Sequence, residues 1–276
     1  MKRILFLYDK RYTTHKNAKL HLEWHKYLKD EFVVQYWGKN FKNEFTQEGL
    51  DKMIDKFKPD YIYCTIRTRY RKWPIYFNKI QIPKIFISVD SYKYKRSHRW
   101  YKNFDQVYTR PVVGTGKSWI TTPVFMWSIP EQQIQRVDPK LRIRDIGFSG
   151  TGKSHVYPIR QAIADVGIRN TPINNPKEYW NYLRSHRALV CPTESSVGDF
   201  LPGKFFEYLA AGAAVITNIN LEKYGLEEFD DKVIRYKSLN DLRTIAKMDF
   251  EPYYEKAFDL LRAKYIDRVR YKELFK

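Results

Sequence analysis

The sequence has few cysteines and no long hydrophobic run. Only two of its 276 residues are cysteines, Cys64 and Cys191, and each lies within an apolar run. This usage predicts buried free thiols in a reducing compartment and argues against a cysteine-based metal site. No stretch approaches the roughly 18 uncharged apolar residues that a membrane-spanning helix needs. We therefore expect a cytoplasmic globular protein without a transmembrane segment.

Acidic residues are also scarce. The chain has 31 Asp and Glu against 50 Lys and Arg, which gives a formal net charge of +19. Residues 1–140 hold 28 basic and 13 acidic side chains, whereas residues 141–276 hold 22 and 18. This asymmetry favours a polyanionic partner on the N-terminal half. The alternative is a surplus of basic residues that serves solubility in a Lys-rich proteome. The aromatic content of 17% argues against intrinsic disorder.

Short apolar runs alternate with helix-like segments in the first half. Helical spacing of apolar residues occurs in Leu20–Leu28 and Glu48–Phe57. The predicted strands are Ile4–Tyr8, Phe32–Tyr36, Tyr61–Cys64, Lys84–Val89 and Asp105–Tyr108. Strands that alternate with helices predict a parallel sheet covered on both faces.

The alternation stops at Ser128–Arg142, a polar stretch with two prolines that is typical of a linker. It resumes with predicted strands at Arg144–Phe148, Ala188–Cys191 and Ala214–Thr217, and with predicted helices at Tyr157–Val166, Lys177–Arg184, Lys204–Ala211 and Tyr253–Phe275. The pattern predicts an α/β protein with two Rossmann-like parallel-sheet domains, residues 1–128 and 142–250, facing a cleft. A C-terminal helix, residues 251–276, would pack back toward the N-terminal domain. Ligands of such sheets bind beyond the carboxyl ends of the strands, which here means the cleft.

The segment Gly147–Ser154 reads GFSGTGKS and matches the P-loop pattern. Its context fits only in part, because the preceding strand is short and charged and no second strand ending in Asp follows to hold Mg²⁺. A glycine-rich strand-to-helix turn that faces a diphosphate explains the segment better than a nucleotide-hydrolysing site.

The most informative segment is Ser195–Thr217, SSVGDFLPGKFFEYLAAGAAVIT. Gly203 precedes a predicted helix, so the backbone amides of Gly203 and Lys204 can point at an anion. Glu207 lies one turn into that helix, where its carboxylate can accept two hydrogen bonds from a ribose diol. The alternative is a packing helix with one solvated acidic residue. Such a helix would need neither the preceding Gly-Asp-Phe-Leu-Pro-Gly segment nor Glu207.

This segment resembles the donor-binding motif of the GT-B glycosyltransferases, in particular the group-1 and spore-maturation-type branch. That motif has a strand, a Ser-rich loop, an acidic residue, a helical Glu after seven further residues, and a small-residue turn before an apolar strand. Asp199, Glu207 and Gly212 match its acidic residue, its Glu and its turn. Two departures are Asp199, where many relatives have Glu, and Lys204, where the branch often has Arg. The branch also opens its second domain with a strand, a Gly-rich loop and an Arg-containing helix, similar to Ile146–Arg160.

The resemblance implies that residues 142–250 bind a nucleotide diphosphate sugar, with a UDP-sugar as the expected donor. The implied donor-binding residues are Gly150, Gly152, Lys153, Arg160, Ser195, Ser196, Gly203, Lys204 and Glu207. Lys204 and Asp199 are candidate catalytic residues. Positive side chains would stabilise the departing diphosphate, so we expect neither a required metal nor a permanently bound cofactor.

Basic and aromatic residues are interleaved between Arg67 and Lys102, with Asp90 as the single acid. Cations neutralise phosphates and aromatic rings stack on bases or sugars, so this segment predicts a polyanion-binding face on residues 1–128, the acceptor domain. The candidate acceptor-binding residues are Arg67, Arg69, Arg71, Lys72, Trp73, Arg96, Arg99 and Trp100. Asp90 is a candidate catalytic base for the acceptor hydroxyl, although a cap or ion-pair role explains it equally well.

Together these features predict a glycosyltransferase whose acceptor is a hydroxymethylated base in DNA, as in the base-glycosylating enzymes of bacteriophages. Its compartment would then be the cytoplasm of a bacterial or infected host cell. An enzyme for cell-surface polysaccharide or lipopolysaccharide, with the basic face on anionic lipid, is the first alternative. A P-loop-type nucleic-acid-binding protein that uses GFSGTGKS is the second. The pair His21 and His25 lacks metalloprotease order and is better explained as surface.

Overall fold

The computed structural model describes residues 1–8, 31–65, 75–88, 103–109, 129–150, 158–171, 173, 175–193 and 201–275. These residues form two compact units. Unit one comprises the described residues up to 109 together with 271–275, and unit two comprises those from 129 to 270. The residues from 129 to 142 and from 251 to 270 therefore group with the sheet of unit two.

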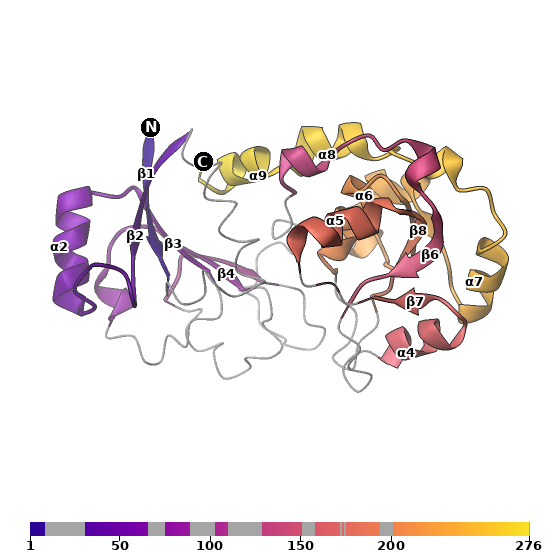
Figure 1. Ribbon diagram of the computed structural model, residues 1–276. Coiled ribbons are helices and arrows are strands. Elements are labelled where there is room, and N and C mark those ends of the chain that lie inside the picture. Colours follow the sequence, from indigo (N-terminus) through magenta and orange to yellow (C-terminus); the bar gives the residue numbers. More distant parts are fainter. Residues whose placement is uncertain are drawn as a thin grey trace. The chain divides into compact units, whose positions relative to one another are not determined.

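Unit one is built on a five-stranded parallel sheet (Figure 1). Its strands are β1 (Lys2–Leu7), β2 (Phe32–Trp37), β3 (Tyr61–Thr65), β4 (Lys84–Ser88) and β5 (Gln106–Thr109), in the order β2-β1-β3-β4-β5. Helix α2 (Gln47–Phe57) begins where the Thr46 side chain accepts a hydrogen bond from the Gly49 amide, and it ends at Lys58 in the left-handed conformation. The strands and this helix match the predicted pattern within a few residues.

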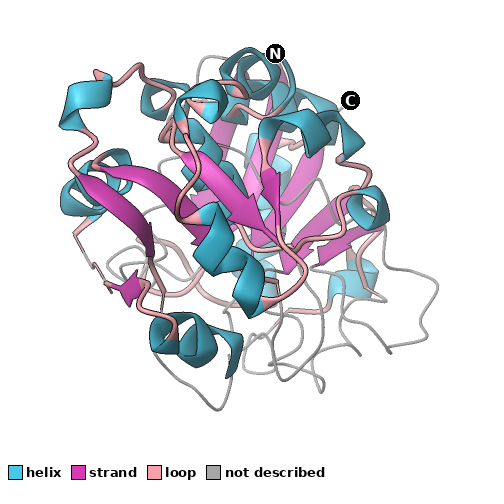
Figure 2. Ribbon diagram, turned by 90° about the vertical axis from the view of Figure 1, so that its right-hand side faces the viewer, coloured by secondary structure: helices cyan, strands magenta, loops and turns pink. Residues whose placement is uncertain are grey.

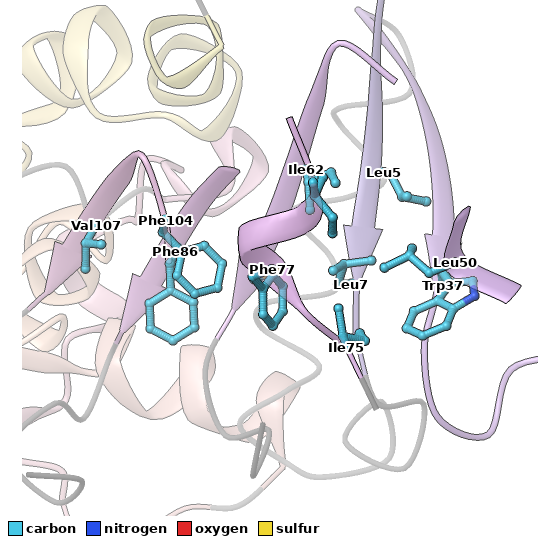
Figure 3. Close-up of a cluster of buried hydrophobic side chains, with 12 residues drawn as sticks. Leu5, Leu7, Trp37, Leu50, Ile62, Ile75, Phe77, Phe86, Phe104 and Val107 are labelled. Atoms are coloured by element: carbon cyan, nitrogen blue, oxygen red, sulfur yellow. The ribbon is translucent and has the colours of Figure 1, made fainter. Parts of the chain in front are cut away.

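Both faces of the unit-one sheet are buried. Leu5 and Leu7 of β1 pack on one face with Trp37 and with Leu50 of α2, as Figure 3 shows. Because successive strand residues point to opposite faces, Phe6 lies on the other face and stacks on Tyr63, with ring centroids 5.0 Å apart. Phe275, at the end of the chain, packs edge-on against Tyr63 at 5.8 Å. The predicted return of the C-terminus to the N-terminal domain is therefore confirmed.

The C-terminal segment is not one helix. The spacing predicts a helix over residues 251–276, but the structure has α8 (Phe258–Lys264) and α9 (Asp267–Leu274). Between them, the Ile129 amide donates to the Tyr265 carbonyl at 2.9 Å and the Asp267 amide donates to the Ile129 carbonyl at 3.2 Å. The backbone at this point bonds to another segment, which interrupts the helical ladder.

Unit two repeats the architecture of unit one. Its strands are β6 (Arg144–Phe148), β7 (Arg169–Asn170), β8 (His186–Cys191), β9 (Ala214–Thr217) and β10 (Ile234–Arg235), all parallel, in the order β10-β9-β8-β6-β7. Its helices are α4 (Pro158–Asp165), α5 (Pro176–Arg184), α6 (Lys204–Ala210), α7 (Leu239–Ile245) and α8. The sequence analysis missed the edge strands β7 and β10, because two residues carry no periodicity.

Helices cover both faces of the unit-two sheet (Figure 2). Val190 of β8 packs in a cluster with Ile163 of α4 and Leu242 of α7. On the other face lie α5 and α6, which also contact β8, and α8 packs against α6. Short 3-10 turns occupy Phe77–Lys79, Glu131–Gln133, Pro139–Leu141, Glu222–Tyr224, Glu227–Lys232 and Glu251–Tyr253.

The two sheets have the same doubly wound order, in which the second strand of each unit lies outside the first. The direction of winding therefore reverses between β1 and β3 in unit one and between β6 and β8 in unit two. In open parallel sheets, ligands bind at the carboxyl ends of the strands that flank this reversal. The predicted class, two Rossmann-like parallel-sheet domains, is confirmed.

Candidate functional site

The candidate site of unit two lies at the carboxyl ends of β6 and β8. The first residue after β6 is Ser149, which is buried and anchored at both backbone groups. Its amide donates to the Tyr208 hydroxyl oxygen at 2.9 Å, and that hydroxyl donates to the Ser149 carbonyl at 3.2 Å. Tyr182 of α5 donates to the neighbouring Phe148 carbonyl at 3.1 Å. Two helices thus hold the start of the glycine-rich turn in place.

Two glycines of GFSGTGKS allow close approach of other side chains. A Cβ on Gly147 would lie 2.5 Å from the His186 Nε2 atom, and one on Gly150 would lie 2.7 Å from a guanidinium nitrogen of Arg160. A side chain at either position would force its neighbour to shift. The absence of a side chain at Gly150 therefore leaves room for the Arg160 guanidinium of α4 beside the turn that follows β6.

Helix α6 carries the other charged groups of the site. It begins after Gly203, and its residues Phe205 and Phe206 are fully buried against unit two. Lys204 and Glu207 lie one turn apart and are only partly buried. Side chains three residues apart on a helix are neighbours, so this short helix presents a cation and a carboxylate side by side.

Tyr179 of α5 joins these two groups. Its hydroxyl donates a very short hydrogen bond to Glu207 Oε2. The Lys204 Nζ atom donates to the Tyr179 hydroxyl oxygen at 3.2 Å and lies 4.9 Å from the centroid of the Tyr179 ring. A single phenol therefore contacts both charged side chains.

Burial changes the acid–base behaviour of these side chains. It lowers the pKa of the Lys204 ammonium; the Glu207 carboxylate works against this change and Arg160 adds to it. Burial, followed by the charge on Glu207, raises the pKa of the Tyr179 phenol well above its usual range. Burial also raises the pKa of the Cys191 thiol, so this cysteine stays protonated. Such concentration of shifted groups is typical of functional sites, although structural networks also produce it.

The structure describes five of the predicted site residues. Gly150, Arg160, Gly203, Lys204 and Glu207 all belong to unit two, and Lys204 interacts electrostatically with both Glu207 and Arg160. The rest lie outside the described residues, namely Gly152, Lys153, Ser195, Ser196, Asp199, Asp90, Arg67, Arg69, Arg71, Lys72, Trp73, Arg96, Arg99 and Trp100. Their roles stay predictions.

Tyr179 and Tyr208 were missed by the sequence analysis. Both are uncharged residues in predicted helices, and neither matches a motif. Their positions follow from the packing of α5 and α6 on one face of the sheet, which periodicity alone does not reveal.

In the described part of the chain, no group of three or more His, Cys, Asp or Glu side chains is arranged to hold a metal ion. Across the same described residues, no helix combines the length and the apolar character required to cross a membrane.

The two doubly wound parallel units have the architecture of the GT-B nucleotide-sugar glycosyltransferases, and solved structures of that class superpose on the chain. Sucrose-phosphate synthase from Thermosynechococcus elongatus does so with a TM-score of 0.64 at 10% identity, covering 100% of this chain and 98% of that one. An α-glucosyltransferase in complex with UDP and a 13-mer DNA containing a central A:G mismatch gives 0.57 at 12% identity, over 100% and 99%. An α1,3-fucosyltransferase with GDP gives 0.50 at 9% identity, over 99% and 88%.

At these identities the similarity concerns the fold, and the GT-B fold expected from the Ser195–Thr217 motif is confirmed. No protein family description and no curated protein matches the sequence.

Proposed function

We propose that the protein is a glycosyltransferase that moves a sugar from a nucleoside diphosphate sugar to a hydroxyl group, with unit two as the donor domain. The observation that carries this proposal is the grouping of Lys204, Glu207 and Arg160 at the carboxyl ends of β6 and β8, where a doubly wound sheet binds ligands. Two neighbouring cations can bind a diphosphate, and the carboxylate beside them can accept hydrogen bonds from a ribose diol.

Each group has a distinct part in the proposed reaction. Glu207 accepts hydrogen bonds from the ribose hydroxyls, while Lys204 and Arg160 contact the diphosphate. As the bond between the sugar and the diphosphate breaks, negative charge grows on the departing oxygen, and the two cations stabilise it. The acceptor hydroxyl loses its proton to a base, for which Asp90 is the candidate. Positive side chains supply the stabilisation, so we expect transfer to persist after treatment with EDTA.

The Glu207→Gln variant tests the donor site. It retains the shape of the side chain but loses the carboxylate, and hydrogen bonds to a charged group contribute about 1.5–3 kcal/mol. Donor affinity should therefore fall by about tenfold to over a hundredfold. The measurement is isothermal titration with UDP and GDP, after a thermal-shift screen of UDP- and GDP-sugars identifies the donor.

Glu228→Gln is the matched control. Glu228 accepts from the Tyr265 hydroxyl at 2.7 Å and contacts Lys264, so its surroundings resemble those of Glu207, but it lies outside the candidate site. Equal donor affinity in Glu207→Gln and wild type would contradict the donor-site assignment. Mg²⁺-dependent ATP hydrolysis that is lost in Lys153→Ala would instead support a P-loop protein.

For the acceptor we propose a hydroxymethylated base in DNA. Two observations support it: the positive charge concentrated in residues 1–140, and the fold shared with an α-glucosyltransferase whose structure contains UDP and DNA. An enzyme that modifies a base in a duplex must extrude that base, and basic and aromatic residues such as those between Arg67 and Lys102 assist this step.

Labelled donor incubated with hydroxymethylated duplex DNA in one reaction, and with a membrane glycolipid in another, distinguishes the acceptors. Transfer of label to the DNA alone supports the proposal. Transfer to the glycolipid alone would favour a cell-surface glycosyltransferase and overturn the DNA acceptor.

A further inference from the structure

The contact between Tyr179, Lys204 and Glu207 has an unusual feature. Lys204 and Glu207 are three residues apart on α6, a spacing at which opposite charges on a helix commonly pair directly. Both residues belong to the described part of the chain, however, and no ion pair joins their side chains. Instead, the Tyr179 hydroxyl lies between them, with the Lys204 Nζ atom 3.2 Å from the phenol oxygen and Glu207 Oε2 in a very short hydrogen bond.

The chemistry of the three groups fixes the direction of both hydrogen bonds. A lysine ammonium has only donors and an ionised carboxylate has only acceptors. The phenol oxygen must therefore accept from Lys204, and the phenol proton must point at Glu207. The raised pKa of Tyr179 agrees with this arrangement, because the phenol keeps its proton. The arrangement occupies one carboxylate oxygen and one of the three ammonium protons.

We propose that Tyr179 is a positioning residue of the donor site, whose phenol separates Lys204 from Glu207 and so keeps the cation available for the diphosphate and the second carboxylate oxygen available for the ribose. This inference rests on the proposed function. Without the phenol hydroxyl, Lys204 and Glu207 collapse into a direct ion pair that competes with the donor for both groups.

The Tyr179→Phe variant tests the proposal, because it retains the ring over which Lys204 lies and removes only the hydroxyl. Tyr265→Phe is its control: it removes a tyrosine-to-glutamate hydrogen bond of 2.7 Å from the same unit, at Glu228, outside the site. The affinities for UDP and GDP are measured by isothermal titration at constant ionic strength, and folding is checked by thermal unfolding. We expect about tenfold weaker binding in Tyr179→Phe, as for the loss of one hydrogen bond to a charged group, and wild-type binding in Tyr265→Phe.

A pH profile separates positioning from simple packing. Diphosphate binding that needs the Lys204 ammonium weakens as the pH rises through the pKa of that group. In Tyr179→Phe the new ion pair with Glu207 stabilises the ammonium, so this loss of affinity should move to higher pH. Adding Glu207→Gln to Tyr179→Phe removes the new partner and should reverse the movement. A merely structural role for Tyr179 would leave the profile unchanged.

The outcomes are distinguishable. Wild-type affinity and an unchanged profile in Tyr179→Phe, with affinity reduced in Glu207→Gln, would overturn the positioning role and leave the proposed function intact. If the wild type binds neither UDP nor GDP, or if Glu207→Gln binds as tightly as wild type, the donor-site assignment and the positioning role both fail.

Discussion

At the scale of single residues, His186 of β8 shows how closely helix α5 and strand β6 are fitted around one side chain. Its ring fills the space that glycine leaves at position 147, and its Nδ1 atom lies 2.7 Å from the Tyr182 carbonyl oxygen. A carbonyl only accepts, so Nδ1 carries the proton and the ring is held in one tautomer. Burial lowers the pKa of His186, and nearby Arg144 lowers it further, while the Tyr182 carbonyl opposes both.

This histidine makes stability depend on pH. Its pKa is lower in the folded protein than the value of about 6.5 in an unfolded chain, so the unfolded state binds the proton more readily. The free energy of unfolding should therefore be highest above pH 6.5 with respect to this group and should fall as the pH decreases toward the folded pKa. For one proton the decrease is at most about 1.4 kcal/mol per pH unit.

His186→Asn retains a donor near the Tyr182 carbonyl and cannot titrate in this range. Urea unfolding of wild type and variant between pH 7 and the onset of acid unfolding measures the effect, since carboxylates affect both proteins alike. The difference in the free energy of unfolding between the wild type and His186→Asn should become smaller as the pH falls. A constant difference would show that His186 does not titrate on unfolding.

At the scale of secondary-structure elements, Arg142 links the ends of several elements by hydrogen bonds. Its guanidinium is buried and donates to the carbonyls of Arg184 and His186 at 3.3 and 3.1 Å, and to those of Ala211 and Gly212 at 3.3 and 2.9 Å. It therefore satisfies carbonyls at the carboxyl ends of α5 and α6, where the helix dipole also favours a cation. Sequence composition placed this residue in a linker, but the structure shows it anchoring both helices of the candidate site.

Replacing Arg142 by Met should leave these carbonyls without a charged donor. Unsatisfied buried groups cost about 1–3 kcal/mol each and are not additive, so we expect a loss of roughly 3 kcal/mol in the free energy of unfolding. That loss corresponds to a decrease of roughly 10 °C in melting temperature for a unit of this size.

Arg136→Met provides the comparison, because the Arg136 side chain is 89% exposed and its ion pair with Glu255 spans 3.6 Å. Exposed pairs contribute about 0–1 kcal/mol. Calorimetric melting temperatures that fall equally in both variants would contradict the anchoring role of Arg142.

At the scale of the whole molecule, the charge asymmetry leads to a prediction about DNA binding. If residues 1–140 neutralise six phosphates, the slope of log affinity against log salt is about −5, and affinity falls roughly a thousandfold between 50 and 200 mM salt. Simultaneous replacement of Arg67, Arg69, Arg71 and Lys72 by Ala should flatten this slope. Fluorescence anisotropy with labelled duplex DNA across a salt series measures it.

Four exposed basic residues of unit two, Arg235, Lys237, Arg243 and Lys247, provide a control set with the same change in net charge. Their replacement should leave the slope as in wild type. Equal flattening by both sets would mean that binding follows net charge rather than a surface on the N-terminal half. Trp73→Ala and Trp100→Ala should weaken binding without changing the slope, because stacking releases no counterions.

Several features of this protein follow from the sequence alone. The apolar runs at Ile4–Tyr8 and Ala188–Cys191 predict the central strands β1 and β8, because a strand buried on both faces must be apolar throughout. The glycine before the helix-like run and the small-residue turn after it predict helix α6, and the resemblance of this segment to the GT-B donor motif implies the fold of the whole chain.

Other features depend on the tertiary structure. Edge strands β7 and β10 exist only because a neighbouring strand supplies their hydrogen bonds, and the break between α8 and α9 depends on a bond to Ile129. Arg142 and Tyr179 act through partners that are distant in the sequence, such as Gly212 and Glu207. Local pattern determines which face of an element is apolar, but the contacts of a polar side chain are decided by which elements pack together.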